Sequence, residues 1–289
     1  MPEELNRDVL EFMGSNKFKV LMPPEILRGE VECFLLNEFA GKEGVSINVF
    51  SNGIPGIVFH HNDGHPAIEN IIMQSGRKFS PPTLFLCGPG TESSVMNFRK
   101  GSYTVLQVIL KPHALKTLFG INALILKEEA VELNEFSTED INEQLMNACS
   151  QQERVALLAS FLARKLEQIK RRDHLVEESL RLIHKSTGTI TVKALLEHLD
   201  ISERQFERRF CQTVGISPIS YMRIRRFNEA MRLMKTRQYD TLTEVAYALK
   251  YHDQSHFIRD LKTFTGITPK SLLQKVDDFY HNPAGYSSM

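Results

Sequence analysis

The chain has few cysteines and no long apolar run. Its four cysteines are Cys33, Cys87, Cys149 and Cys211, and no two of them form a Cys-x-x-Cys pair. This spacing excludes a zinc-finger or disulfide framework and fits a reducing compartment. No apolar stretch approaches the ~18 residues that a membrane-spanning helix needs, and charged residues begin at Glu3. We therefore expect a cytoplasmic protein without a membrane partner.

The chain also lacks net charge, with 35 Lys and Arg against 35 Asp and Glu. Taken alone, this balance argues against a nucleic-acid partner, because affinity for DNA comes largely from neutralising phosphates. The charge is unevenly distributed, however. Residues 173–276 carry 17 Lys and Arg against 12 Asp and Glu, a net of +5, so the rest of the chain carries −5. The C-terminal third is the part predicted to bind nucleic acid.

That C-terminal third contains an internal repeat. Residues 205–210 (QFERRF) are followed by residues 214–218 (VGISP), and residues 256–261 (HFIRDL) are followed by residues 265–269 (TGITP). Internal repetition defines the structural unit before any single residue is interpreted.

The first copy predicts two short helices joined by a tight turn. The first helix, residues 190–199, has one apolar face, formed by Val192, Leu195, Leu196 and Leu199. Ser202 is a suitable N-cap for a second helix over residues 203–214, which buries Phe206 and Phe210. Gly215 suits the left-handed conformation that ends a helix. This is the helix-turn-helix arrangement of DNA-binding proteins.

The second copy repeats the pattern with one extra residue in its turn. The apolar face of its first helix is formed by Leu242, Val245, Ala246 and Leu249. Asp253 is the expected cap of its second helix, Phe257 and Leu261 are the expected buried residues, and Gly266 is the expected end.

The two copies are joined by a predicted helix over residues 218–237. Its apolar residues at helical spacing are Tyr221, Ile224, Phe227, Ala230, Met231 and Met234. A helix of roughly 18 residues is about 27 Å long, close to the ~34 Å between successive major grooves. One chain can thus place two recognition helices in adjacent grooves. The cluster of Arg223, Arg225 and Arg226 either contacts phosphates or keeps the helix soluble.

The exposed face of the second helix in each copy determines what it reads. In the first copy this face carries Arg204, Glu207, Arg208 and Gln212; in the second it carries Gln254, Ser255, Arg259 and Lys262. Arg pairs with guanine, Gln with adenine, and Ser with either base. Any one of these residues fits a solvated helix face equally well. The matching positions and residue types in both copies favour base reading.

Residues 173–276 resemble the DNA-binding domain of the AraC/XylS family of bacterial transcription regulators. The most specific stretch is residues 253–259 (DQSHFIR), followed by Lys262 and the TGITP run. The chain departs from the family at Asp200, where Gly is common, at Leu196, where Ala is common, and at residues 250–252 (KYH), where the family has Gly-aromatic-Ser/Asn.

The resemblance implies roles for particular residues. The base-contacting set would be Arg204, Glu207, Arg208, Gln254, Ser255 and Arg259. Further DNA contacts would come from Gln205, Gln212, His256 and Lys262. Double-stranded DNA is the implied partner, together with RNA polymerase.

The N-terminal half is rich in short β-type runs. Five candidate strands are residues 45–50, 56–60, 83–87, 95–98 and 103–110, separated by Gly- and Asn-containing turns. They predict a small antiparallel sheet or barrel, followed by a helix over residues 112–119 that ends at Gly120. Residues 1–16 look like an irregular or helical lead-in. Residues 87–89 and 110–114 are similar to N-terminal domains of some AraC-like regulators, which implies a cupin-like domain that binds a small-molecule effector or dimerises.

Two sites in this half invite an enzymatic interpretation. His60, His61, His65 and Glu69 suggest a metal cluster, but the spacing departs from His-x-His and an exposed polar turn is favoured. Residues 87–90 lack the Lys of a phosphate loop, and Cys87 would need a base to act as a nucleophile. We expect no catalytic residue, metal or other cofactor.

A predicted helix over residues 153–169 links the two halves. Its apolar seam is Val155, Leu158, Leu162, Leu166 and Ile169. The seam packs against its own domain or pairs with a second subunit in a homodimer. Residues 170–172 (KRR) then form a polar junction into a helix over residues 175–184, whose Val176, Leu180 and Ile183 should pack on the first helix-turn-helix.

The sequence therefore predicts an α+β protein. A β-rich, cupin-like domain with helices spans residues 1–150, a helical connector residues 151–172, an all-α double helix-turn-helix domain residues 173–276, and a tail residues 277–289. The predicted function is a DNA-binding transcription regulator, tuned by an effector or by dimerisation and not an enzyme. The alternatives are a cupin-type metalloenzyme or ligand-binding protein fused to a DNA-binding domain, and a regulator that binds no small ligand. A fused DNA-repair alkyltransferase would need cysteine motifs that are absent here.

Overall fold

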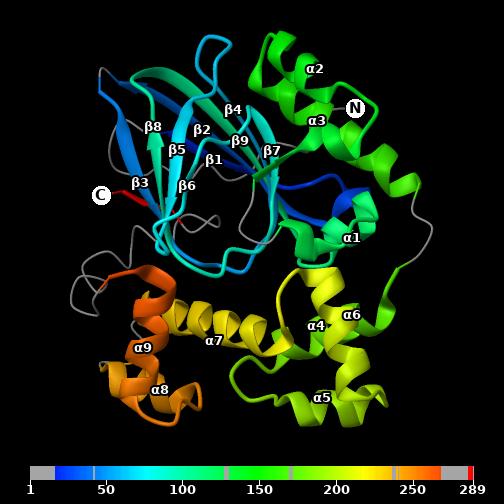
Figure 1. Cartoon of the computed structure of the whole chain (residues 1–289), viewed down its shortest axis with the longest axis vertical. Coiled ribbons are helices and arrows are strands. Elements are labelled where there is room, and N and C mark those ends of the chain that lie inside the picture. The colour runs from blue at the N-terminus through cyan, green and yellow to red at the C-terminus, as the bar shows by residue number, and fades with distance from the viewer. Residues whose placement is uncertain are drawn as a thin grey trace.

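Two structural units are stacked along the long axis of the molecule (Figure 1). The computed structural model describes residues 17–41, 43–126, 130–168, 172–235, 239, 241–267 and 286–288. The first unit is β-rich with helices along one side, and the second is helical. The predicted α+β class is confirmed.

The β-rich domain contains two antiparallel sheets. The first sheet has the order β1-β2-β9-β4-β7-β10. Its strands are β1 (Lys17–Leu21), β2 (Val31–Gly41), β9 (Gly101–Leu110), β4 (Gly56–His61), β7 (Leu84–Cys87) and β10 (Ala130–Glu132). The second sheet has the order β11-β3-β8-β5-β6. Its strands are β11 (Tyr286–Ser288), β3 (Val45–Val49), β8 (Ser94–Phe98), β5 (Ile68–Met73) and β6 (Lys78–Phe79).

The five predicted strands correspond to β3, β4, β7, β8 and β9. The others were not predicted. One of them, β11, lies in the segment predicted to be a tail, and Tyr286 pairs with Val49 at the edge of the second sheet. Residues 1–16 lie outside the described residues, so the predicted lead-in stays a prediction.

The first sheet is buried on both faces, which explains its apolar sequence. Ile57 and Phe59 face a core shared with helices, whereas Val58 between them faces the second sheet. In β7, Leu84 and Phe85 divide in the same way. Since successive side chains of a strand point to opposite faces, a sheet covered on both sides reads as a continuous apolar run.

Helices and 3-10 turns cover the outer face of the first sheet. They are α1 (Ala114–Phe119), α2 (Ile141–Asn147) and α3 (Gln151–Glu167), with η1 (Glu25–Leu27), η2 (Ala123–Leu126) and η3 (Leu133–Phe136). As predicted, α1 ends at Gly120, whose φ of 67° is left-handed.

The apolar seam of α3 packs within its own domain. Val155, Leu158 and Leu162 are buried in the core beneath the first sheet, and Leu166 packs against it. This confirms the first of the two predicted alternatives and leaves these side chains no surface for a second subunit. Ile169, Lys170 and Arg171 lie outside the described residues.

The helical domain contains six described helices before residue 268. They are α4 (His174–Lys185), α5 (Val192–Leu199), α6 (Glu203–Val214), α7 (Pro218–Lys235), α8 (Leu242–Ala248) and α9 (Gln254–Thr265). In Figure 1, α7 runs between α4–α6 at one end and α8–α9 at the other.

The caps and ends of the recognition helices follow the sequence closely. Asp253 caps α9 by accepting from the His256 amide at 2.6 Å. Ser202 is the N-cap residue of α6, but its side chain makes no capping hydrogen bond. Gly215 and Gly266 end the two helices with φ of 91° and 72°.

Both turns contain a left-handed residue that is not Gly. Asp200 has φ 47° and Lys250 has φ 58°. At both positions the AraC/XylS family commonly has Gly, so the left-handed backbone conformation is kept here without Gly. Asp enters the left-handed region more readily than most residues, whereas Lys250 is strained by comparison.

The helical domain has one continuous apolar core. Phe206, Phe210 and Tyr221 form a chain of rings at one end, with centroids 5.6 and 5.7 Å apart. Phe227 and Phe264 meet at 5.3 Å at the other end. Both recognition helices are therefore anchored by aromatic side chains on the face opposite their exposed one.

We predict that Phe206→Ala and Phe257→Ala each lower the free energy of unfolding by about 3–5 kcal/mol, because both rings are fully buried. Denaturant-induced unfolding followed by circular dichroism measures this loss. Tyr247→Ala is the control, since that ring is 69% exposed on α8. Wild-type stability in either Phe variant would show that the buried face is misassigned.

Candidate functional site

The exposed face of α6 carries all of the residues predicted there. Arg204, Gln205, Glu207, Arg208 and Gln212 are exposed. They lie on the sides of α6 that do not carry the buried residues Phe206 and Phe210.

The exposed face of α9 presents a similar set. Gln254, Ser255, Arg259 and Lys262 are exposed. His256 is half-buried, and its ring meets Tyr251 edge-on at 5.4 Å. His256 therefore contributes to packing of the turn. The base and phosphate contacts assigned to these residues stay predictions.

A buried carboxylate fixes α9 against the connecting helix. Asp260 is fully buried on α9, and its Oδ1 accepts a hydrogen bond from Nη2 of Arg223 at 2.5 Å. Arg226 Nη2 lies 3.8 Å from Oδ2, and its guanidinium stacks over the Tyr251 ring at 4.1 Å. The predicted role of these arginines was phosphate contact or solubility, and the role of Asp260 was not predicted.

A second ion pair orients α6. Arg209 donates from Nε and Nη2 to the carboxylate of Asp173, at 3.0 and 2.6 Å. Asp173 also caps α4 by accepting from the Val176 amide. One carboxylate thus ties the first recognition helix to the start of the helical domain.

The two domains are joined by a further ion pair, in which one partner is buried. Arg172, 33% exposed, donates to Glu30, which is 1% exposed and lies just before β2. Burial raises the pKa of Glu30, and the Arg172 guanidinium opposes that rise. Arg172 belongs to the segment predicted to be a polar junction, and it serves here as an interdomain anchor.

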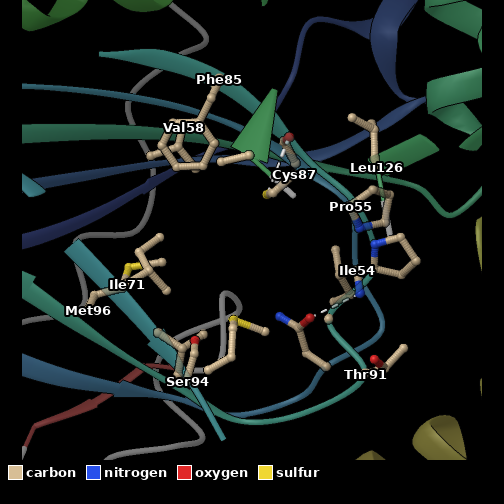
Figure 2. Close-up of a pocket in the computed structure, with 18 of the residues that line it drawn as sticks. Ile54, Pro55, Val58, Ile71, Phe85, Cys87, Thr91, Ser94, Met96 and Leu126 are labelled. Carbon is tan, nitrogen blue, oxygen red and sulfur yellow. Dashed lines mark hydrogen bonds between the residues drawn. The ribbon is translucent and has the colours of Figure 1, made fainter. Parts of the chain in front are cut away.

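A pocket of about 130 Å³ lies between the two sheets (Figure 2). Val58 and Phe85 line it from the first sheet, and Ile71 and Met96 line it from the second. Residues 49–56 and 87–92 close it at the end that faces the helical domain. This pocket was not predicted, because its walls come from strands that are far apart in the chain.

Cys87 lines this pocket but shows no sign of nucleophilic activation. Burial raises the pKa of its thiol to about 11, and Sγ lies 3.5 Å from the Gly56 carbonyl oxygen, to which it donates. The following residue, Gly88, is closely packed, since a Cβ there would lie 2.5 Å from the Leu126 carbonyl oxygen. Residues 88–90 thus form a packed turn after β7.

A larger cavity, about 410 Å³, separates the two domains. Lys111 and His113 line it from the β-rich domain, and His184 and Arg225 line it from the helical domain. His184 Nε2 lies 2.7 Å from the hydroxyl of Tyr221. Burial, with Arg225 and Lys111 nearby, lowers the pKa of His184 to about 4. The lining has mixed charge: Lys111, Arg181 and Arg225 are cationic, and Glu32 and Glu177 are carboxylates.

The histidine cluster of the β-rich domain is not an exposed turn throughout. His60 is fully buried, and its Nδ1 accepts hydrogen bonds from the amides of Ala67 and Ile68 at 3.0 and 3.2 Å. His61 is half-buried, while His65 and Glu69 are exposed. The predicted exposed polar turn is therefore wrong for His60, whose ring holds the connection between β4 and β5 through these two hydrogen bonds.

Among the described residues, no group of three or more His, Cys, Asp or Glu side chains is arranged to hold a metal ion. No helix in the described part of the chain has the length and apolarity to cross a membrane.

Two family models match the chain. A helix-turn-helix domain matches residues 195–275, and a domain of unknown function, DUF6597, matches residues 19–132. The arabinose operon regulatory protein of Escherichia coli (strain K12) is 27% identical over 135 residues, covering 43% of this chain and 46% of that protein. The match thus spans less than half the length of this relative.

Solved structures give weaker global likenesses. An apo ToxT variant from Vibrio cholerae strain SCE256 has 15% identity and a TM-score of 0.45, covering 83% of this chain and 97% of that one. A transcriptional regulator with an AraC-type DNA-binding domain from Chromobacterium violaceum has 22% identity and a TM-score of 0.33, covering 35% and 90%. At these TM-scores the likenesses carry no argument about function.

The double repeat, its fold and the matched family model define a helix-turn-helix DNA-binding domain. The predicted resemblance to the AraC/XylS family is confirmed by this match and by the similarity to the arabinose operon regulatory protein.

We predict that Asp260→Asn lowers the free energy of unfolding by about 1.5–3 kcal/mol, the usual worth of a hydrogen bond to a charged group. It should also speed amide exchange in α9 more than in α6. Asp173→Asn is the matched control, because Asn caps a helix as well as Asp does and Arg209 is 39% exposed. Equal losses in both variants would argue against a special role for Asp260.

We predict that stability falls as the pH drops from about 6.5 towards 4. Burial lowers the pKa of His60 to about 4, so the unfolded chain binds a proton in this range that the folded chain does not. At ~1.4 kcal/mol per pKa unit, the loss from this residue approaches about 3 kcal/mol. Unfolding measured across pH should show a shallower dependence in His60→Gln. His65→Gln, at an exposed position, should retain the wild-type slope.

Proposed function

We propose that this chain is a sequence-specific transcription regulator that acts in the bacterial cytoplasm. It would insert α6 and α9 into consecutive major grooves of duplex DNA. The observation that carries the proposal is the pairing of two exposed Arg- and Gln-bearing helix faces on one rigid frame. The connecting helix α7 has 18 residues, about 27 Å, which suits the ~34 Å between grooves.

In this proposal the β-rich domain is the sensor. The mostly apolar pocket between its sheets is the supporting feature, because ligand sites are concave and mostly apolar with a few polar groups. The proposal includes RNA polymerase as a protein partner. Homodimerisation stays a prediction, and because the apolar seam of α3 is buried, a dimer would form through another surface.

The rival function, a cupin-type metalloenzyme fused to the DNA-binding domain, has less support. It needs ring nitrogens of the histidine cluster as metal ligands. Nδ1 of His60 is already used by two backbone amides, and His65 is exposed. Metal analysis of the purified protein, with His60→Gln and His65→Gln as variants, distinguishes the two functions.

Selection of binding sites from a random duplex pool, at two salt concentrations, tests the proposal. Enrichment of two half-sites about one helical turn apart supports it. Salt-sensitive binding without sequence preference would count against base reading by at least one helix.

We predict that Arg208→Ala and Arg259→Ala each weaken binding to the selected site by ~1–3 kcal/mol and relax the preference at one base pair. Each variant should affect only the half-site that its own helix reads. Fluorescence anisotropy with single-base variants of the site measures both effects. Lys193→Ala, which removes an 87% exposed cation from α5, is the control for simple loss of charge. A uniform loss on every sequence would make the two arginines phosphate contacts.

A further inference from the structure

The pocket between the sheets offers no counter-charge to an anion. Its described lining contains no Lys, Arg or His. Its one carboxylate, Glu92, accepts hydrogen bonds from the amide and hydroxyl of Ser75, at 2.7 and 2.9 Å. An anionic ligand buried here would lose its hydration without gaining an ion partner among the described residues, which is strongly unfavourable. The carboxylate that could pair with a cation, Glu92, is already engaged by Ser75, so the described lining favours neutral molecules.

The volume of the pocket limits the size of the ligand. It measures about 130 Å³ and is walled by aliphatic, aromatic and Met side chains, among them Ile71, Phe85 and Met96 (Figure 2). Apolar protein cavities of ~150 Å³ stay dry and bind benzene. A six-membered ring is thus of comparable size, and because the pocket is only partly enclosed a small substituent can extend from it.

Phe50 belongs to the pocket and to the helical domain at once. It lines the pocket, yet it is 1% exposed and lies in the apolar core that contains Phe206 and Phe257. Among the described residues of the β-rich domain, only Phe50 belongs to this core. A ligand against this ring therefore touches the core that anchors both recognition helices.

The residues after Phe50 are clamped between the pocket rim and the helices. The Ser51 amide donates to the Phe264 carbonyl of α9 at 2.9 Å, while the Ser51 hydroxyl donates to the Gly90 carbonyl at 2.7 Å. The Asn52 carbonyl accepts from the Asn228 side chain of α7 at 3.0 Å.

The next residue approaches α7 still more closely. Gly53 has a left-handed φ of 67°, and a Cβ there would lie 3.0 Å from Cγ2 of Ile224. Both conditions favour Gly at this position. The loop after Phe50 is thus held tightly on both sides.

We propose that this pocket binds a neutral, largely apolar molecule about the size of a substituted six-membered ring, and that residues 50–54 transmit its occupancy to α9. The regulatory effect of the ligand rests on the proposed function, in which α9 reads DNA. Binding of the ligand to the pocket does not depend on that function.

The ligand class is tested by titrating the full chain with three probes of one shape. Cyclohexylmethanol is neutral, cyclohexanecarboxylate is an anion, and cyclohexylmethylamine is a cation at neutral pH. Cyclohexylmethanol should raise the Tm in a saturable way, because a ligand that binds the folded state stabilises it. The other two should leave the Tm unchanged. Equal stabilisation by the carboxylate overturns the ligand class and directs attention to Lys111 and Arg225 in the interdomain cavity.

Substitutions that fill the pocket test whether cyclohexylmethanol binds there. Ile71→Trp fills the pocket from β5 and should abolish the shift, whereas Ile72→Trp, at the neighbouring 37% exposed position, should retain it. Ser94→Phe fills the same space from β8 and covers the case in which Ile71→Trp does not fold. A shift that persists in both filling variants overturns the assignment to this pocket.

Transmission is tested by amide exchange with saturating cyclohexylmethanol and no DNA. Exchange should slow at Ser51 and more strongly in α9 than in α6, because Ser51 is hydrogen-bonded directly to Phe264 of α9. Phe50→Leu should remove the effect in α9, while Phe79→Leu should preserve it, because Phe79 lines the pocket without belonging to the helical core. Protection of α9 that persists in Phe50→Leu overturns the transmission step.

The DNA experiment separates the two proposals. Failure to select any sequence, with ligand-dependent protection of α9 intact, counts against the proposed function alone. A selected operator whose α9 half-site is bound equally with and without cyclohexylmethanol counts against this inference alone.

Discussion

The buried carboxylate of Asp260 is the contact on which the reading geometry depends. A protein that reads two successive grooves must hold both recognition helices at a fixed separation and rotation. The first helix is set by aromatic packing and the Arg209–Asp173 pair near the surface. The second is set by one carboxylate shared between Arg223 and Arg226 of α7, with Tyr251 stacked beneath the second guanidinium. Since an unpaired buried charge is costly, rotation of α9 away from α7 is strongly resisted. The exposed faces of α6 and α9 therefore move with α7.

The helical domain and the β-rich domain are not structurally independent of each other. Phe50 completes the core of the helical domain, and the Ser51 amide caps the carbonyl of Phe264 at the end of α9. At the other end, Gly215 after α6 lies against Pro89 and the Ala123 carbonyl of the β-rich domain. Both helix-turn-helix units thus end against residues near the rim of the apolar pocket. A change in that rim must either be absorbed locally or alter the relation of the two units, because packed cores deform little.

The helical domain was predicted far better than the β-rich one, for physical reasons. The α6 helix, Glu203–Val214, matches the predicted range, since its apolar spacing and terminal Gly215 are local signals. In contrast, β2 and β5 were missed. Val31–Gly41 is buried on both faces and reads without alternation, and Ile68–Met73 has an irregular burial pattern after a register shift. The roles of Asp260 and His60 lay beyond sequence reasoning, because their partners are fixed only by tertiary structure. The ten predicted DNA contacts lie on the intended helices, and their roles await measurement.

The pairing of β11 with β3 bears on how the chain is made. Tyr286–Ser288 adds an edge strand to a sheet whose other members lie between residues 45 and 98. During synthesis, the edge of β3 therefore stays open until almost two hundred further residues have left the ribosome. Open strand edges are templates for association with other chains, and nascent multidomain proteins are vulnerable at this stage. Because the helical domain lies between the two parts of this sheet in the sequence, it is tethered to the β-rich domain on both sides. Any rearrangement that keeps β11 in place therefore keeps the helical domain connected to the β-rich domain at both of its ends.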